Sequence, residues 1–226
     1  MENLLQKLIP NVMGKLPELW ECCGQTLVMI LVSGLISFAF GLVFGVLLTV
    51  TRRGGILQSA AVFAVLDKAI NIFRSIPFII LLFALIPLTR AVVGTAIGTR
   101  GAILPLIFGT VPFFSRQIES ALSELPEGLV RAAQSMGVSP LGIITRVYLR
   151  ECIPGIVRAA AITFVSLVGL TAMAGAVGGG GLGDFAIRYG YQRNQMDVTY
   201  VSVLILLLLV SLIQWLGNLV IRKTTH

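Results

Sequence analysis

The chain has few charged residues and almost none of the residues that commonly bind metals. Only 12% of its 226 residues are charged, whereas ordinary soluble domains carry roughly a quarter. Its single histidine stands at position 226, and its three cysteines, Cys22, Cys23 and Cys152, form no CxxC pair. We therefore expect no metal site, and we interpret the cysteines as apolar or interfacial thiols.

Motifs for catalysis are absent from the sequence as well. It has no Walker motif, no pair of carboxylates placed for acid–base chemistry, and no cluster of His, Asp or Ser–Lys groups. The glycine-rich stretch at 171–184 lacks both the Lys-Ser/Thr pair of a phosphate-binding loop and the strand that precedes such a loop. These absences disfavour an intramembrane enzyme and predict a non-catalytic protein.

Long uncharged runs, by contrast, are abundant. Mean hydropathy is +0.94, and runs without a charged residue cover 22–51, 75–89, 101–115, 159–183 and 198–221. A helix needs about 20 apolar residues to cross the hydrocarbon core, so three runs suffice alone and two must borrow flanking residues. Backbone groups must be hydrogen-bonded within the bilayer, and runs without strand alternation favour helices over a barrel. The sequence predicts an all-α integral membrane protein.

We divide the chain into a short lead-in and one membrane domain. Residues 1–21 are mixed polar, with Trp20 at the expected headgroup level; the alternative is a poorly ordered terminus. No cleavable signal peptide is expected, because the first apolar run is long enough to stay in the membrane. The domain covers 22–222, with five predicted spans at about 26–50, 68–88, 101–118, 153–177 and 198–221, and a loop at about 119–152.

Two segments within the spans are candidates for the lining of a pathway. Pro77 kinks the second span beside Arg74 and Ser75, and a bend beside polar residues can line a polar cavity. The alternative is an arginine that snorkels to the interface. Met173 is a large flexible side chain among small ones, next to Gly175, and such a residue can plug a narrow pore; the alternative is simple core filling.

Small residues in the first span have a different interpretation. Gly34, Gly41 and Gly45 recur at spacings of seven and four. Small side chains at such intervals let helices approach closely in lipid, so we interpret them as packing positions.

The loop between the third and fourth spans is the longest polar segment of the chain. Its centre predicts a helix over Leu129–Met136, a C-terminal cap at Gly137, an N-cap at Ser139 and a first helical position at Pro140. This is a helical hairpin at the membrane surface, with a face of small residues formed by Ala132, Ala133 and Gly137. The residues leave two alternatives open: the hairpin docks into a groove on a partner, or it packs on its own bundle.

The distribution of positive charge predicts the orientation. Five spans place the termini on opposite sides, and loops rich in Lys and Arg face the cytoplasm. With Lys68 and Arg74 of the second span left out, the loop side carries nine such residues and the other side six, which places the loop and the C-terminus in the cytoplasm and the N-terminus outside. The net charge of +7 therefore reports cytoplasmic loops rather than a nucleic-acid partner. The nine are Arg52, Arg53, Arg116, Arg131, Arg146, Arg150, Arg158, Arg222 and Lys223, and the six are Lys7, Lys15, Arg90, Arg100, Arg188 and Arg193.

The loop sequence RAAQSMGVSPLGIITRVYLRECIPG resembles the EAA loop of permeases from ABC importers, the segment that docks into the cleft of the ATP-hydrolysing subunit. Ala132, Ala133 and Gly137 match in place. Val147 and Leu149 stand where the family has Ile and Leu. Arg131 replaces the acidic residue of the family motif and Arg150 replaces its proline, so a salt bridge from the family glutamate is not expected here.

Further segments extend the resemblance to the methionine-import permease subfamily over about residues 20–222. They are 71–82, 86–90, 168–169, 172–177, 180–183 and 189–191. The resemblance implies a type I ABC importer permease: a homodimer in the cell membrane, with two cytoplasmic ATPase subunits that bind the ATP and an extracytoplasmic substrate-binding protein. It implies docking through Arg131, Ala132, Ala133, Met136, Gly137, Ser139 and Pro140, and a translocation path with Met173, Arg74, Ser75, Pro77 and Gly175.

Other functions remain as alternatives. Related permeases of this size carry other amino acids or small peptides. A channel or secondary transporter without ATPase subunits predicts acidic groups within the spans for ion coupling, and Asp67 is the candidate. Such a transporter also predicts internal repeats, which the sequence does not have. A bare membrane scaffold would leave the docking hairpin unexplained.

Overall fold

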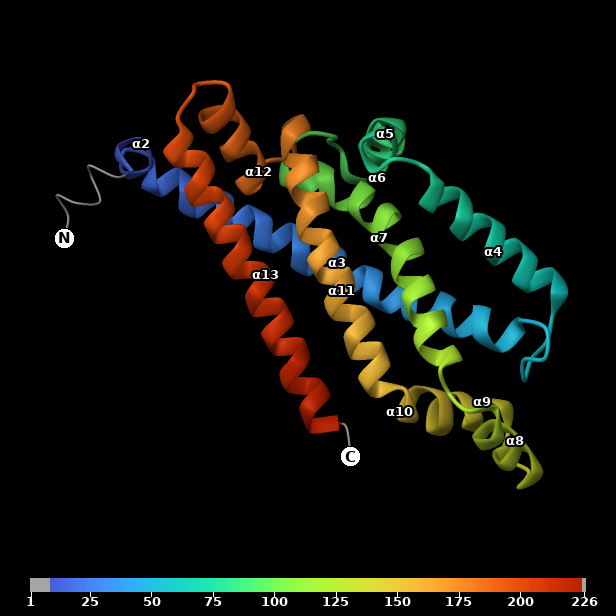
Figure 1. The fold of residues 1–226 in the computed structure, drawn as a ribbon. Coiled ribbons are helices and arrows are strands. Elements are labelled where there is room, and N and C mark those ends of the chain that lie inside the picture. The colour runs from blue at the N-terminus through green and yellow to red at the C-terminus, as the bar shows by residue number, and fades with distance from the viewer. Residues whose placement is uncertain (1–8, 225–226) are drawn as a thin grey trace. The chain divides into compact units, whose positions relative to one another are not determined.

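The computed structural model describes residues 9–224, and within that range the ordered elements are helices (Figure 1). The chain forms two compact units, here called unit 1 and unit 2. Unit 1 comprises Met1–Leu35, Pro77–Ile107 and Phe164–Ile213, and unit 2 comprises Ile36–Ile76, Phe108–Thr163 and Gln214–His226. The all-α prediction is confirmed for the described residues.

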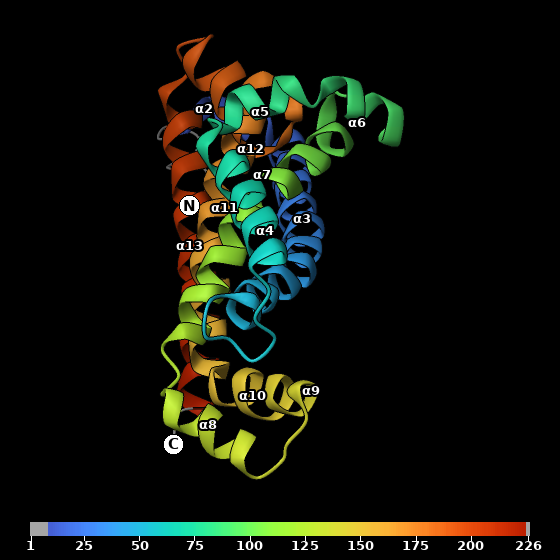
Figure 2. The ribbon, with the colours of Figure 1, turned by 90° about the vertical axis from the view of Figure 1, so that its right-hand side faces the viewer.

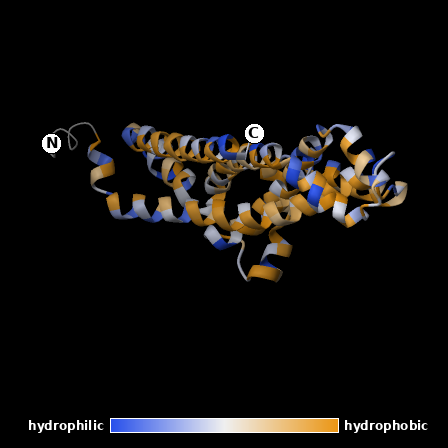
Figure 3. Cartoon of the chain, turned by 90° about the horizontal axis from the view of Figure 1, so that it is seen from below, coloured by the Kyte–Doolittle hydropathy of each residue, from blue (hydrophilic) through white to orange (hydrophobic). Residues whose placement is uncertain are grey.

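Long apolar helices make up most of the chain. Within residues 9–224, four helices are long and apolar enough to cross a membrane. Figure 3 shows apolar residues, in orange, along much of the chain. The four long helices are α3 (Leu16–Thr51), α7 (Gly98–Ser123), α11 (Ile153–Ala174, apolar to Gly179) and α13 (Met196–Thr224). Four of the five predicted spans thus have a helix of sufficient length.

The predicted second span, 68–88, is not one helix. It is divided among α4 (Ala60–Ser75), α5 (Phe78–Ala84) and α6 (Ile86–Val93). Ile76 is extended at φ −83° and ψ 122°, as expected of a residue before proline, and Pro77 has no N–H to continue the helix. The predicted kink at Pro77 is therefore a complete break, and a fifth spanning helix is not confirmed.

The N-terminal lead-in is helical over much of its described part. A short helix, α2 (Pro10–Met13), precedes α3, which begins at Leu16, about a turn and a half before the predicted boundary at residue 21. Part of the predicted lead-in, with Glu2 and Lys7, lies outside the described residues. Trp20 is therefore a residue of α3, and its side chain is exposed.

Unit 1 has two apolar clusters. One joins Met29, Leu106 and Leu167, and the other joins Leu19, Phe185 and Val198. The glycine-rich end of α11 runs through η2 (Gly175–Gly179), α12 (Gly181–Phe185) and η3 (Ala186–Tyr191) before α13 begins. Gly178 and Gly180 have φ of 90° and 75°, so the chain reverses there in conformations that glycine adopts readily.

Unit 2 contains the loop predicted to be a hairpin. α8 (Glu127–Ser135) lies beside the rod formed by α9 (Pro140–Ile143), η1 (Ile144–Tyr148) and α10 (Leu149–Glu151), as Figure 2 shows. α7 continues to Ser123, beyond the predicted third span at 101–118. In α3 a Cβ at Gly41 would lie 2.5 Å from the Phe114 ring, and one at Gly45 would lie 2.5 Å from Ile118. The prediction that these glycines let helices approach closely is confirmed.

Candidate docking hairpin and pathway segments

The turn of the hairpin is built by backbone hydrogen bonds around Gly137. Its φ is +73°, in the left-handed region that costs glycine little. The Gly137 N–H donates to the carbonyl of Gln134 at 3.0 Å, and the Val138 N–H donates to the carbonyl of Ala133 at 3.1 Å. This pair of bonds is the Schellman arrangement, which satisfies the last carbonyls of α8. The predicted C-terminal cap is confirmed.

The second helix of the hairpin starts as predicted. Ser139 has extended backbone angles, and its Oγ accepts a hydrogen bond from the Gly142 N–H at 3.3 Å. Pro140 occupies the first helical position, where its missing N–H costs nothing. The two caps fix both ends of the turn, so four exposed residues between α8 and α9 are held in one conformation: Met136, Gly137, Ser139 and, at the start of α9, Pro140.

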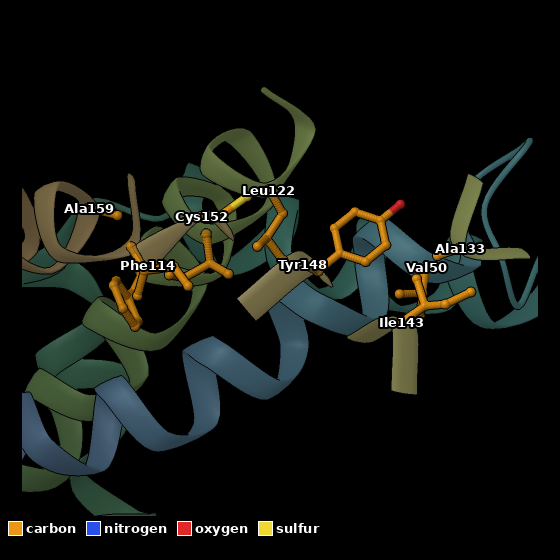
Figure 4. Packing of buried hydrophobic residues seen from close by; sticks show 10 residues of the cluster. Val50, Phe114, Leu122, Ala133, Ile143, Tyr148, Cys152 and Ala159 are labelled. Carbon is orange, nitrogen blue, oxygen red and sulfur yellow. The ribbon is translucent and has the colours of Figure 1, made fainter. Parts of the chain in front are cut away.

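Ala133 does not lie on the outer face of the hairpin. It is 4% exposed and packs in the cluster with Val50, Ile143 and Tyr148, whereas Ala132 is exposed (Figure 4). The predicted small-residue face of Ala132, Ala133 and Gly137 is therefore wrong at Ala133, because the helix turns that methyl group onto its own bundle. A small residue there lets α8 approach the neighbouring segments closely.

The inward face of the hairpin is apolar enough to shift the pKa values of two polar groups buried in it. Burial raises the pKa of the Tyr148 hydroxyl and of the Cys152 thiol. Both groups stay neutral at physiological pH. The hairpin thus packs on the rest of unit 2 through an uncharged core, and charged residues such as Glu127 and Arg131 are exposed.

The outer face of the hairpin presents large apolar side chains beside charged ones. Met136 is 75% exposed, and Leu141 is 72% exposed. Arg131 donates from Nη2 to Glu127 Oε2 at 2.8 Å, one turn earlier on α8. Leu141 was not among the predicted docking residues. Its place directly after Pro140, on the outer side of the first turn of α9, is the signal that could have found it.

The two polar residues predicted for the pathway lie at the end of α4 in unit 2. Arg74 and Ser75 are exposed, and Ser75 Oγ donates to the carbonyl of Asn71 at 2.8 Å. Pro77 belongs to unit 1, at the start of α5, with φ −54°. The break after Ser75 therefore puts Arg74 and Ser75 on a different helix from Pro77, which was predicted to kink the span beside them.

Met173 and Gly175 have opposite surroundings in unit 1. Met173 is 41% exposed, which disfavours simple core filling. Gly175 is buried, and a Cβ there would lie 2.5 Å from the Asp184 N and 2.9 Å from the Gly180 carbonyl oxygen. Gly175 is thus a close-packing position that lets the chain fold back beside α11. Of the two residues, Met173 is the one whose side chain is exposed and could line a pathway.

The reversal after η2 is held to α3 by side chains that the sequence did not single out. Gln25 Oε1 accepts from the Gly181 N–H at 2.7 Å, and Thr26 Oγ1 accepts from the Leu182 N–H at 2.8 Å. These bonds satisfy backbone donors where the helix is interrupted, as irregular backbone in a membrane requires. Because 156 residues separate Gln25 from Gly181, no local pattern could have predicted them.

A polar cavity of about 180 Å³ opens beside this reversal, lined among others by Glu18, Gln25, Thr99 and Arg188. Arg188 donates to Glu18 at 2.7 Å and to Asp184 at 2.7 Å. Burial opposes the charge on Arg188, but the hydrogen bonds to Asp184 and Glu18 outweigh it and raise its pKa. The Tyr189 hydroxyl donates to Glu18 at 2.8 Å.

The spanning helices and the capped hairpin define an all-helical integral membrane protein with a rigid, partly apolar projection. Residues 41–226 match the family described as "Binding-protein-dependent transport system inner membrane component", and the chain belongs to this family. The resemblance to importer permeases is thereby confirmed.

Individual relatives cover nearly the whole chain. The "Probable D-methionine transport system permease protein MetI" of Vibrio cholerae is 48% identical over 89% of this chain and 90% of its own length. The "Methionine import system permease protein MetP" of Bacillus subtilis is 42% identical over 96% of this chain and 97% of its own. The two matches therefore cover nine-tenths or more of each relative's own length.

Solved structures agree with the fold. A chain of the MetNI methionine ABC transporter, solved in inward-facing conformations, superposes with a TM-score of 0.89 at 45% identity, over 93% of this chain and 98% of its own. An amino acid ABC transporter solved with histidines superposes with a TM-score of 0.77 at 16% identity, which shows a shared fold alone.

Proposed function

We propose that this chain is the permease subunit of an ATP-driven methionine importer in the cell membrane. It would form the translocation path as a homodimer, with two cytoplasmic ATPase subunits and an extracytoplasmic substrate-binding protein. The observation that carries the proposal is the capped hairpin with exposed Met136 and Leu141, in a chain of which two relatives named for methionine transport are 48% and 42% identical. Another amino acid or a small peptide is the alternative substrate.

The hairpin supports docking because its outer face is rigid and partly apolar. Exposed large apolar side chains beside charged residues are typical of a protein–protein contact. Met136, at the C-terminal cap of α8, would enter a cleft on the ATPase subunit together with Arg131 and Ala132 of that helix. Gly137, Ser139 and Pro140 would set the turn that presents them, and Ala133 would hold α8 to its own unit.

The translocation path is proposed to use the residues predicted for it. Arg74 and Ser75 at the end of α4 are polar groups exposed on an otherwise apolar helix end, a placement that suits a water-filled path better than lipid. Met173 would narrow the path, and Pro77 and Gly175 would shape the breaks on either side of it. ATP binding would move the hairpins, and alternating access would follow.

The charge bias supports a cytoplasmic hairpin and C-terminus, with the N-terminus and the 184–197 segment outside. On this orientation the polar cavity beside Glu18 and Arg188 faces the binding protein. The permease would carry out no chemistry and bind no cofactor, because ATP is hydrolysed by its partner.

Uptake by a reconstituted assembly tests the proposal. Proteoliposomes would contain this chain, its ATPase subunit and its binding protein, and radiolabelled methionine, histidine and a dipeptide would be compared. The proposal expects ATP-dependent uptake of methionine that the variant Met136→Asp/Leu141→Asp abolishes. The matched control is Leu57→Asp, at an exposed leucine of the turn between α3 and α4, which should retain uptake and ATPase co-purification. Uptake of histidine or the dipeptide instead would overturn the substrate, and uptake without ATP would overturn the class.

A further inference from the structure

α4 is attached to unit 2 by very little apolar contact. Of its sixteen residues, all within the described part of the chain, only Ile70 is buried. One aromatic contact adds to this: the rings of Phe73 and Phe108 lie 5.6 Å apart between centroids. A helix of this length would ordinarily bury a stripe of several apolar residues to stay in place.

A polar network supplies the remaining attachment, and its centre is Arg116 on α7. Arg116 Nη2 donates to Asn71 Oδ1 at 3.0 Å and also contacts the Asp67 carboxylate. Arg116 Nη1 donates to Glu119 Oε2 at 2.7 Å. Asp67 and Asn71 lie one turn apart on α4, on the side that also carries Ile70, so a single guanidinium holds two positions of that helix.

The surroundings make these bonds strong. The side chains of Arg116, Asp67 and Glu119 are 20%, 32% and 18% exposed, within a chain whose helices cross a bilayer. Charge pairs interact more strongly where they are partly shielded from water, and arginine stays charged rather than losing its proton. An unpaired Asp67 or Arg116 would be costly there, so α4 and α7 are held together at this point.

The same stretch of α7 is fastened to the hairpin. Ile118 and Leu122, within two turns of Arg116, are buried in the cluster that contains Ala133, Ile143 and Tyr148. Figure 4 shows Leu122 among these residues. Just beyond them, Arg52 Nη1 donates to Ser123 Oγ at 2.7 Å. α7 is therefore fixed to the hairpin through its apolar side and to α4 through its polar side.

We propose that Arg116 is a positioning residue that transmits movement of the hairpin to α4. It would act through Asp67 and Asn71, and α4 carries Arg74 and Ser75 one to two turns further on. The inference rests on the proposed function, because it assigns a residue to the link between the ATPase subunits and the path. Asp67, the candidate for ion coupling in a secondary transporter, has instead a fixed cationic partner on α7.

The test is the ratio of methionine transported to ATP hydrolysed in the reconstituted complex. We expect Arg116→Gln to lower this ratio by about 2- to 30-fold, the range found for residues that carry coupling, while the ATPase subunit still co-purifies. The double variant Asp67→Asn/Arg116→Gln removes both charges of the contact between α4 and α7 and leaves only Glu119, on α7 itself, without its partner. It should therefore fold more readily than Arg116→Gln, and its ratio should stay low. Arg116→Lys keeps the charge and should recover part of the ratio. Arg53→Gln, at an exposed arginine of unit 2, is the matched control and should keep the wild-type ratio.

A second measurement keeps the inference testable if Arg116→Gln does not assemble. With spin labels on Val65 of α4 and Gly128 of α8, both exposed, the distance between the labels should stay constant on ATP addition in the wild type and should change in the double variant, where α4 no longer follows the hairpin. An unchanged ratio, or a label distance that stays constant in the double variant as well, would overturn the role of Arg116. Failure of the wild type to transport methionine would instead overturn the proposed function.

Discussion

The hairpin turn of unit 2 and the glycine-rich reversal of unit 1 use the same backbone device in different surroundings. Both turn at glycines with positive φ, Gly137 in the first and Gly178 in the second. A Cβ at Gly137 would meet no described atom within 4 Å, whereas a Cβ at Gly175 beside the reversal would collide with backbone. The reversal is therefore tightly packed at Gly175, although Gly178 itself has open space, whereas the hairpin turn is open at Gly137 and available to a partner.

The largest expected effect is at the packed joint. Gly175→Leu should destabilise the protein by about 3 kcal/mol, the upper end for overpacking, because the colliding atoms are backbone and cannot rotate away. Thermal unfolding of the detergent-solubilised protein measures this. Gly169→Leu is the control, since α11 has open space at that position and its stability should change little. Equal melting temperatures for the two variants would refute the distinction.

A smaller effect is expected at the open turn. Gly137→Ala should cost about 1 to 2 kcal/mol, from the left-handed backbone alone. Gly137→Asn should cost less, because asparagine tolerates that conformation. Gly128→Ala, inside exposed α8, should be neutral or stabilising. If Gly137→Ala destabilised as strongly as Gly175→Leu, packing rather than conformation would dominate at the hairpin.

Loss of the N-cap should be milder still. Ser139→Ala removes the acceptor for the Gly142 N–H and should cost about 1 kcal/mol. Hydrogen exchange at Gly142 and Ile143 would measure the local loosening. The control is Ser135→Ala, since Ser135 Oγ donates to a carbonyl within α8 and caps no helix end. Faster exchange in the control than in Ser139→Ala would count against the capping role.

The smallest effect on stability is expected at Arg131. Its pair with Glu127 is more than three-quarters exposed on both sides, so Arg131→Ala should cost about 0.2 to 0.5 kcal/mol. Co-purification of the ATPase subunit should fall all the same, because Arg131 is proposed to face that partner. Arg150→Ala serves as the comparison on α10. Unaltered co-purification in Arg131→Ala would remove it from the docking surface.

The parts of the molecule predicted from sequence are those fixed by neighbours along the chain. The caps at Gly137 and Ser139 depend on contacts within five residues, and the break at Pro77 depends on the proline itself. The inward rotation of Ala133 and the attachment of α4 through Arg116 depend on partners far away; Asp67 lies 49 residues from Arg116. Sequence patterns of composition and spacing carry no information about such pairs.

The central claim is that a soluble partner grips the hairpin from the cytoplasmic side. Ser135→Cys, in a chain with Cys22, Cys23 and Cys152 changed to alanine, tests it directly with a membrane-impermeant maleimide, and Asn194→Cys provides the external control. The account predicts that the reagent labels Asn194→Cys on intact cells and labels Ser135→Cys only in inverted vesicles, where bound ATPase subunit protects it. Labelling of Ser135→Cys on intact cells, with none in inverted vesicles, would contradict the account.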